Sequence, residues 1–184
     1  MTSRIDPTAS ADPLALFHEW VDGDEMVLAT ATSDGRPSAR CVLLKGADER
    51  GFTFYTAYTS RKGRDLEANP WAALLFRRDG IQVRVEGRVE QLPARESDAY
   101  WNSRPAGSRR SAAASHQSEP VASRSELEAA VAAQPDEPER PPWWGGYRLV
   151  PEAYEFWRGR DDRLHERHLF LAGDHGWDVQ LLQP

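Results

Sequence analysis

The chain has 184 residues, 23 Lys and Arg against 29 Asp and Glu, a formal net charge of -6, and one cysteine. This length suits one domain with a substantial core that needs no metal or disulfide for stability. The acidic balance argues against general nucleic-acid binding, which relies on clustered positive charge. A disulfide within the chain is excluded, and a reducing compartment is favoured.

No run of residues approaches the roughly twenty apolar positions that cross a bilayer. The first residues carry acids and prolines instead of a basic and then apolar leader. We therefore expect a cytoplasmic protein with neither a membrane nor a nucleic acid as its partner. Residues 1–25 are expected to form an N-terminal arm with a short helix, and residues 26–184 a single domain.

The N-terminal half alternates between helical and strand patterns. Pro13 to Val21 has apolar residues near helical spacing, which predicts a short amphipathic helix after a loose arm. Strands are expected over Met26–Thr32, Ala39–Lys45 and Phe52–Thr56, with the Asp34-Gly35 turn signal joining the first two. Ser60 can cap a helix that runs through Leu66 and ends before Asn69-Pro70.

A second hairpin is expected from Trp71–Phe76 and Ile81–Gln91 around Asp79-Gly80. A helix is then expected over Pro93–Ser103. Another is expected from Ser123 to about Gln134, because Ser123 and Glu126 form a capping-box pattern.

Short segments complete the pattern beyond a proline-rich connection. These β-like segments are Tyr147–Val150, Tyr154–Trp157, His168–Leu171 and Trp177–Leu182. Seven or eight mostly adjacent strands with a few helices predict a mainly β fold with helices, an antiparallel barrel and not a parallel doubly wound sheet.

Three clusters of residues could carry chemistry. The first contains Arg40, Lys45, Arg61 and Lys62, with Tyr55, Thr56 and Ser60 between them. Arginine offers a bidentate fork, lysine a point charge and a helix start unpaired N–H groups, so the cluster could hold a phosphate dianion. A solvated basic edge is the alternative interpretation.

The second cluster contains Tyr100, Arg104 and Ser108, followed by Arg109 and Arg110. Tyr100 and Arg104 are four residues apart and share a helix face, whereas Ser108 lies beyond the helix-breaking Pro105, in a predicted loop that could fold over a ligand. The cluster is either a second anion site or an arginine-rich surface loop.

The third cluster contains Arg163, His165 and Arg167. On an extended segment their alternation would place all three side chains on one face. Such like charges repel one another unless an anion or an electron-rich ring lies opposite. The shared face would be lost if the segment were helical or irregular.

Other candidate sites are weaker. The histidines and the cysteine lack metal-ligand spacing, so no metal is expected. There is no glycine-rich dinucleotide fingerprint or phosphate loop. Trp157 could face a planar ligand, although packing is its default role, and Cys41 is expected to be a buried strand residue.

In order, these segments resemble the pyridoxamine 5′-phosphate oxidase family. The resemblance covers about Met26 to the C-terminus and rests on several ordered motifs. They are Arg40-Cys41-Val42-Leu43-Leu44-Lys45, Phe54-Tyr55-Thr56, Ser60-Arg61-Lys62-Gly63, Gln82-Val83-Arg84-Val85-Glu86-Gly87, Ser103-Arg104-Pro105, Gln117-Ser118, Trp144-Gly145-Gly146-Tyr147-Arg148, Glu155-Phe156-Trp157 and Arg163-Leu164-His165-Glu166-Arg167.

The resemblance implies an FMN-binding split β-barrel that works as a homodimer, with FMN at the interface. It assigns the FMN site to Arg40, Val42, Leu43, Lys45, Tyr55, Thr56, Arg61, Lys62, Gln82, Gln117, Ser118, Trp157 and Arg167, partly from the second subunit. It places Lys45, Tyr100, Arg104 and Ser108 at the substrate phosphate and the catalytic pair Arg163 and His165 beside the substrate ring.

The implied reaction converts pyridoxine or pyridoxamine 5′-phosphate to pyridoxal 5′-phosphate, with O2 as acceptor and H2O2 as product. Two alternatives stay open. The N-terminal arm lacks the family's basic, tyrosine-containing segment, and the Leu181-Leu182-Gln183-Pro184 ending is similar to that of phenazine-biosynthesis flavin oxidases. These departures favour an oxidase of a dihydroaromatic natural-product intermediate. The other alternative is a non-catalytic protein that binds flavin or pyridoxal phosphate.

Overall fold

The computed structural model describes residues 12–184, so the predicted arm over residues 1–11 lies outside the described residues. The strands are β1 (Glu25–Ala31), β2 (Pro37–Leu43), β3 (Gly46–Asp48), β4 (Gly51–Ala57), β5 (Trp71–Arg78), β6 (Ile81–Gln91), β7 (Trp144–Arg158), β8 (Glu166–Gly173) and β9 (Gly176–Leu181). The helices are α1 (Pro13–Trp20), α2 (Arg61–Ala68), α3 (Ala94–Ser103), α4 (Ala106–Ala114) and α5 (Arg124–Ala132).

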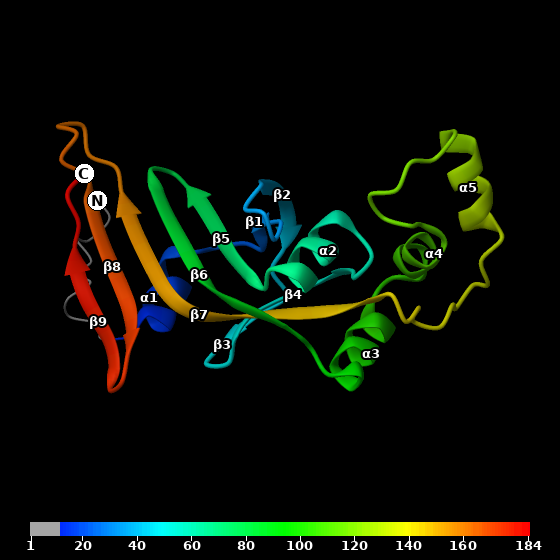
Figure 1. The fold of residues 1–184 in the computed structure, drawn as a ribbon, viewed down its shortest axis with the longest axis horizontal. Helices are drawn as coiled ribbons and strands as arrows, with labels where there is room; N and C mark the ends of the chain where they lie inside the picture. The colour runs from blue at the N-terminus through cyan, green and yellow to red at the C-terminus, as the bar shows by residue number, and fades with distance from the viewer. Residues whose placement is uncertain (1–11) are drawn as a thin grey trace.

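All nine strands of the described residues form one antiparallel sheet in the order β2-β1-β5-β6-β7-β4-β3, with β8 and β9 added beside β7. The strand β7 connects the two ends of the molecule (Figure 1). Its residues 144–149 pair with β4 and its residues 153–158 pair with β8, while β6 lies along its other edge. The antiparallel, mainly β fold expected from sequence is confirmed.

The long strand β7 replaces the two strands that the sequence predicted on either side of Pro151. Pairing with β6 continues past this proline because the register shifts between Glu86 and Gly87. A Cβ on Gly87 would lie 1.9 Å from the Val150 carbonyl oxygen, so the backbones approach as closely as only glycine allows. A β-bulge of this kind bends a strand without ending it.

The core lies on one face of the sheet and is covered by α1. Asp12 caps this helix by accepting a hydrogen bond from the Leu14 amide at 2.9 Å, with proline at the first position, where its missing N–H costs nothing. The Phe17 ring meets Phe52 and Phe76 edge to face, with centroids 4.8 and 5.0 Å apart. The predicted helix therefore belongs to the packing of the sheet.

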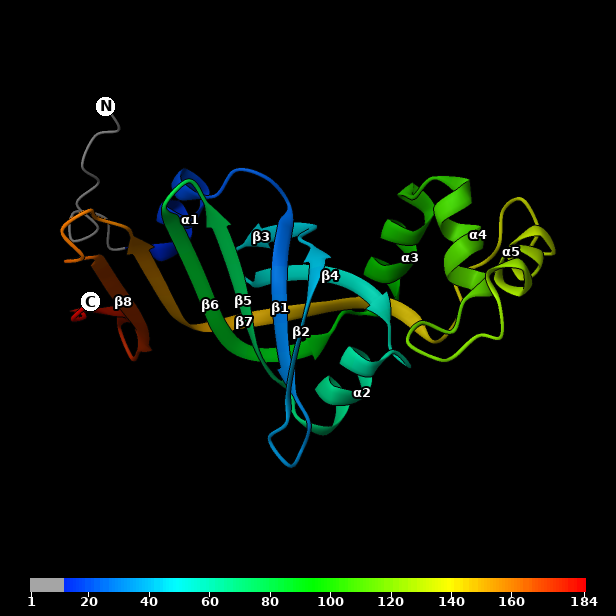
Figure 2. The same ribbon diagram turned by 90° about the horizontal axis from the view of Figure 1, so that it is seen from above.

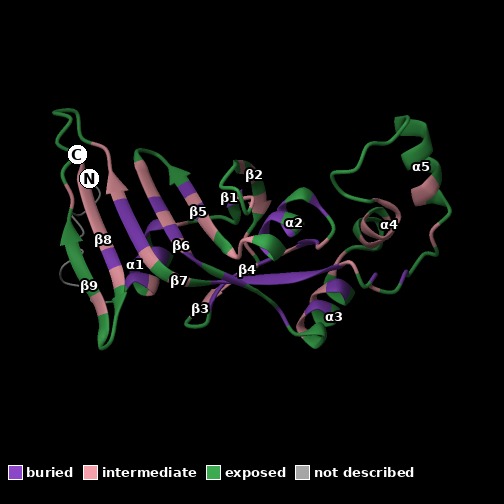
Figure 3. Ribbon diagram, in the orientation of Figure 1, coloured by how far each residue is buried: buried purple, intermediate pink, exposed green. Residues whose placement is uncertain are grey.

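The helices α3, α4 and α5 lie together at one end of the molecule, away from β8 (Figure 2). The helix α4 occupies residues that the sequence predicted as a loop, because Pro105 starts a new helix as well as ending the previous one. Arg110 links α4 to α5 by donating to the carbonyls of Val131 and Ala132 at 3.3 and 3.2 Å. Most of α5 is exposed (Figure 3).

The remaining element boundaries agree with the sequence predictions to within a few residues, apart from the unpredicted β3. The prediction for Cys41 was wrong, since its side chain is exposed. Cys41 is on β2, an edge strand, and points to the face of the sheet opposite the core. An apolar run predicts burial only where something covers both faces.

Candidate functional site

A cleft of about 600 Å³ opens between β2, β4 and the helices α3 and α4. It brings together most of the predicted site residues of the first two clusters. The lining contains the predicted residues Arg40, Val42, Leu43, Lys45, Tyr55, Thr56, Lys62, Tyr100, Arg104, Ser108 and Gln117. Residues separated by some 80 positions in sequence thus line the same cleft. The hypothesis that these clusters bind phosphate requires such proximity.

Lys62 supplies a buried positive charge to this cleft. Its Nζ donates to the Thr56 hydroxyl and the Gln117 side-chain oxygen, each at 2.9 Å, and to the Ser60 hydroxyl at 3.2 Å. These partners are all neutral. Burial, and secondarily the charge of Arg40, lower the pKa of Lys62 to about 8. A buried ammonium group with only neutral partners favours an anionic ligand.

Arg40 is the second cation on this wall. Its Nη1 donates to the Leu28 carbonyl at 3.0 Å and to the Thr30 hydroxyl at 2.8 Å. The Thr30 hydroxyl in turn donates to buried Asp65 at 2.7 Å. Burial lowers the pKa of Arg40, while the Asp65 carboxylate, 3.8 Å away, opposes that effect. Thr30 and Asp65 fix Arg40, and the sequence prediction missed both because neither belongs to a charged cluster.

Aromatic rings form the opposite wall. Tyr55 and Tyr100 stack with ring centroids 3.8 Å apart, and Trp144 lies parallel to Tyr100 at 6.2 Å. The Arg104 guanidinium covers the Trp144 ring at 4.6 Å, an arrangement that holds the cation without neutralising it. Its Nη1 is buried without a hydrogen-bond partner among the described residues. An acceptor from a ligand would satisfy this atom.

The helix α4 contributes to the cleft along its length. Ser108 lies in its first turn, and Ser111, Ala112 and Ser115 line the cleft as well. These three residues were missed, although the Ala112-Ala113-Ala114 run is a helix signal. Arg109 and Arg110 turn away toward Glu137 and Asp136, each 3.5 Å from an arginine nitrogen. The second cluster therefore divides into cleft residues and residues that tie α4 to the following segment.

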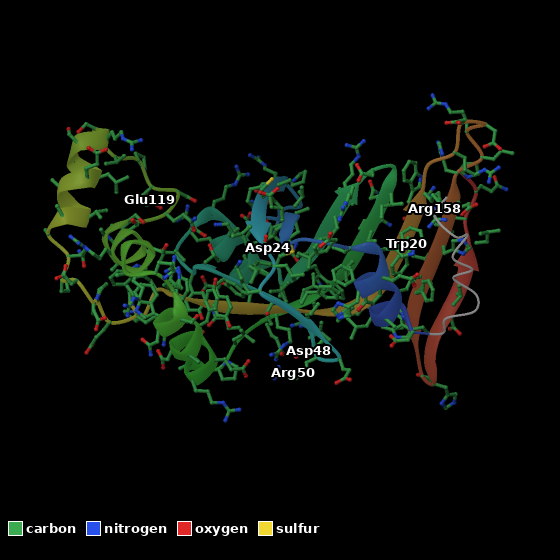
Figure 4. All side chains as sticks on the ribbon, turned by 180° about the vertical axis from the view of Figure 1, so that it is seen from behind. Trp20, Asp24, Asp48, Arg50, Glu119 and Arg158 are labelled. Atoms are coloured by element: carbon green, nitrogen blue, oxygen red, sulfur yellow. The ribbon has the colours of Figure 1, made fainter. Side chains whose placement is uncertain are left out.

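Lys45 lies at the mouth of the cleft. Its Nζ is 2.7 Å from Asp24, whose position in the loop before β1 is marked in Figure 4. That carboxylate accepts a hydrogen bond from the lysine and has its pKa lowered by it. Arg61 is exposed at the start of α2 and does not line the cleft. Ser118 also lies outside the lining, next to Gln117, with a positive φ of 75°.

A second group of predicted residues lies at the other end of the sheet. Gln82, Trp157 and Arg167 are cross-strand neighbours on β6, β7 and β8. The His165 ring lies 4.9 Å from the Trp157 ring and accepts a hydrogen bond at Nδ1 from the Arg160 amide at 3.1 Å. None of these residues lines the cleft. One protomer therefore holds two separate groups of predicted site residues.

Of the two possibilities that the sequence left open for Arg163, His165 and Arg167, the structure has the irregular one, so the three residues do not alternate on an extended segment. Arg163 is in a turn with a φ of 66°, and its amide donates to the Arg160 carbonyl at 3.1 Å. Only Arg167 belongs to β8. Just before this turn the Arg158 guanidinium lies 4.7 Å from the centre of the Trp20 ring (Figure 4). The segment between β7 and β8 is therefore an irregular loop.

An antiparallel sheet with a cationic, aromatic-walled cleft and a second polar group on its far strands defines a class of proteins that bind phosphorylated aromatic ligands. The comparisons with known proteins name the family. The model described as "Pyridoxamine 5'-phosphate oxidase" matches residues 20–134, and "Pyridoxine 5'-phosphate oxidase C-terminal dimerisation region" matches residues 144–184. The chain belongs to the pyridoxamine 5′-phosphate oxidase family, whose members are FMN-dependent oxidases.

Individual relatives agree with this assignment. A pyridoxine/pyridoxamine 5′-phosphate oxidase of Bordetella petrii is 52% identical over all of this chain and 94% of its own length. That of Paraburkholderia phytofirmans is 57% identical over 86% of this chain and 78% of its own length. PhzG from Burkholderia lata, solved with tetrahydrophenazine-1-carboxylic acid, is 34% identical, with a TM-score of 0.89 over 99% of this chain and 98% of its own.

The likeness to these proteins establishes the split-barrel fold expected from sequence. A related FMN-binding protein of Nostoc punctiforme has the same fold at 21% identity, with a TM-score of 0.74 over 98% of this chain and all of its own. Among residues 12–184 no helix is long and apolar enough to span a membrane.

The residues present fit FMN. Its phosphate needs cations that lack carboxylate partners, and Lys62 is buried among neutral acceptors. The unpaired Nη1 of Arg104 provides for a second anion on the far wall of the same cleft. The cleft therefore has one anion-seeking position for the cofactor phosphate and a second one beside it.

Proposed function

We propose that this protein is an oxidase of pyridoxine and pyridoxamine 5′-phosphate that uses FMN and O2 and yields pyridoxal 5′-phosphate and H2O2, with water also consumed and ammonia released when the substrate is the amine. The observation that carries the proposal is the pairing of two cationic positions within one cleft, Lys62 on one wall and Arg104 on the other. A non-phosphorylated substrate would leave Arg104 unpaired.

In this proposal the FMN phosphate is bound by Arg40, Lys62 and the neighbouring Arg61. Lys62 and the Thr56 hydroxyl now donate hydrogen bonds to the Gln117 side-chain oxygen, and in the proposal they would donate to phosphate oxygens instead. The other proposed contacts with FMN are Val42, Leu43, Lys45, Tyr55, Gln82, Ser118, Trp157 and Arg167. The substrate phosphate is bound by Lys45, Tyr100, Arg104 and Ser108, all of which line the cleft.

We propose a homodimer in which each cleft is completed by the far strands of the partner. The C-terminal match is to a dimerisation region, and it contains Trp157, Arg163, His165 and Arg167. A patch of small apolar side chains on β1, β2 and β5, on the face opposite the core, suits a self-complementary contact. We call Val27, Ala29, Ala39, Cys41, Ala73 and Leu75 the small-residue face; they are neighbours in register, and all are at least partly exposed.

Bound FMN would supply two-electron chemistry, taking hydride from the C4′ carbon of the substrate and passing two electrons to O2. The residues of the chain position the substrate and handle charge. Because His165 accepts a hydrogen bond at Nδ1 from the Arg160 amide, Nε2 is the ring nitrogen left to contact a substrate. Arg163 is exposed in one protomer, and in the proposed dimer it would be available to a ligand held by the other.

The roles of Arg163 and His165 can be tested by substitution. Arg163→Ala and His165→Ala should each lower kcat/KM by roughly tenfold to a hundredfold, because each loses a contact to the reacting substrate. FMN content should be unchanged. Leu164→Ala is the control, since this side chain is 65% exposed and lies between them. Full turnover in both arginine and histidine variants would contradict the proposed roles.

The reaction itself is tested by aerobic turnover. The FMN-loaded protein is mixed with each phosphorylated vitamer, and pyridoxal 5′-phosphate and peroxide are followed together. Equal and rapid formation of both supports the proposal. If the protein carries FMN and neither substrate reduces it, the proposed substrate is wrong.

The structural likeness to PhzG favours one alternative, oxidation of a dihydroaromatic natural-product intermediate. Tetrahydrophenazine-1-carboxylic acid therefore belongs in the same assay. Flavin reduction by this acid and not by the vitamers would select the alternative. Tight binding of flavin or pyridoxal phosphate with no reduction by any of them would instead indicate a non-catalytic binding protein.

A further inference from the structure

A buried carboxylate that the proposed function does not use lies within the second group of site residues. Glu155 on β7 is 3% exposed. Its Oε1 accepts a hydrogen bond from Arg167 Nε at 2.7 Å, and its Oε2 forms an ion pair with Arg84 Nη2 at 2.8 Å. A buried charge is costly unless paired, and two arginines from the flanking strands β6 and β8 provide the pairing here.

The two arginines depend on Glu155 to different degrees. Arg84 has a second carboxylate, Glu86, whose Oε1 is 2.6 Å from Arg84 Nε. Among residues 12–184, Glu155 is the one carboxylate paired with Arg167. Loss of the Glu155 charge would leave Arg84 paired and Arg167 unpaired. Its effect should therefore concentrate on Arg167.

Glu155 also fixes the direction of the Arg167 guanidinium. Nε is bound to Glu155, and Nη1 donates to the Gln183 carbonyl at 3.1 Å. Two bonds on a planar group define its plane, and Nη2 is the nitrogen left for a ligand. Arg167 is opposite Trp157 in register. The plane of its guanidinium group therefore determines how Arg167 can bind a ligand that lies beside the Trp157 ring.

We propose that Glu155 is a positioning residue for the flavin: it holds Arg167 in the orientation in which Arg167 binds FMN. The inference rests on the proposed function, in which Arg167 contacts the cofactor. It adds a residue that touches neither cofactor nor substrate and acts through its bond to Arg167.

The test compares FMN dissociation constants, measured by flavin fluorescence during titration of the full-length apoprotein. Glu155→Gln keeps the shape of the side chain and removes its charge, and should weaken FMN binding by about tenfold. Glu86→Gln is the matched control, because it removes a carboxylate bound to Arg84 and not to Arg167, and should change binding by less than about twofold.

A double-mutant cycle separates positioning from general support of the sheet. On an Arg167→Ala background, Glu155→Gln should cause no further loss of FMN affinity, since the group through which it acts is gone. An equal loss on both backgrounds would overturn the inference, as would wild-type affinity in Glu155→Gln. If the wild-type protein itself binds no FMN, the proposed function fails first.

A shorter acid covers the case in which Glu155→Gln does not fold. Glu155→Asp keeps the charge that both arginines need but moves it one methylene away from Arg167. It should fold and still bind FMN several-fold more weakly, by roughly three to five times. Unchanged affinity in this variant would mean that the orientation of Arg167 does not matter, and the inference would be wrong.

Discussion

The charge of Lys62 depends on the surroundings that the fold gives it. In sequence it is one of four basic residues at strand ends or at a helix start, and a solvated edge explained them equally well. Burial beside Arg40 lowers its pKa to about 8, within reach of ordinary experiments. Its role is therefore open to a pH test.

FMN affinity should fall as pH rises through about 8. A phosphate dianion favours the protonated lysine, so above the pKa of the free protein, binding must take up a proton. Lys62→Arg should keep its affinity at pH 9, because arginine stays charged there. The measurement is a fluorescence titration with FMN from pH 6.5 to 9.5. An equal decline in both proteins would show that Lys62 does not cause it.

Arg104 should discriminate between phosphorylated and free substrates. Arg104→Ala is expected to raise KM for pyridoxine 5′-phosphate by about tenfold or more, because the phosphate loses a charge-assisted partner. The change in kcat should be smaller than the change in KM. Steady-state kinetics with the phosphorylated and free vitamers checks this. Arg95→Ala changes an exposed arginine in the first turn of α3, the helix that Arg104 follows as C-cap, and should leave both constants unchanged.

At the scale of elements, the sequence predicted most of the helices and strands. The errors occurred at prolines, because proline can either end or begin a secondary-structure element. Proline ends helices, so the chain after Pro105 was predicted as a loop. It also starts them, which is what it does for α4. Pro151 was read as a strand boundary, but the bulge beside Gly87 accommodates it. Local rules give both outcomes, and only packing selects between them.

The helix α1 should be essential to the stability of the sheet. Phe17→Ala removes a ring that is 2% exposed and contacts Phe52 and Phe76, so unfolding free energy should fall by about 3–5 kcal/mol. Urea denaturation followed by tryptophan fluorescence measures the change. Glu19→Ala on the exposed side of the helix is the control and should stay within about 0.5 kcal/mol of the wild type. Equal stability of the two variants would mean that α1 is only loosely attached.

At the scale of the whole molecule, the two groups of site residues are at different ends of one sheet. Residues of α3 and α4 line the cleft, whereas Trp157 is on β7 opposite Arg167 on β8. Figure 1 shows these two helices and β8 at opposite ends of the ribbon. A site that requires both groups must then be assembled from two protomers. A variant that no longer forms the dimer should therefore also bind the cofactor more weakly.

Ala29→Glu places a charge in the middle of the small-residue face and should convert the dimer to monomers, because an unpaired carboxylate in an apolar contact is strongly unfavourable. FMN binding should weaken by about tenfold or more in the same variant. Light scattering with chromatography gives the mass, and fluorescence gives the affinity. Ala129→Glu on exposed α5 is the matched control. If the Ala29→Glu variant is still a dimer, the small-residue face is not the dimer interface.

The sequence by itself determined the family and the fold, because ordered motifs from Arg40 to Arg167 and the alternation of short strands are local properties of the chain. It also placed most of the cleft residues, since charge and aromatic character are visible in each motif. Only the tertiary structure decided which of these residues meet in one protomer and how they are supported. Asp65 below Arg40 and the role of Glu155 behind Arg167 were not found from sequence, although Glu155 belongs to the Glu155-Phe156-Trp157 motif, because no local signal marks a supporting carboxylate. Burial and partners define its role, and both depend on strands and helices that are far apart in the chain.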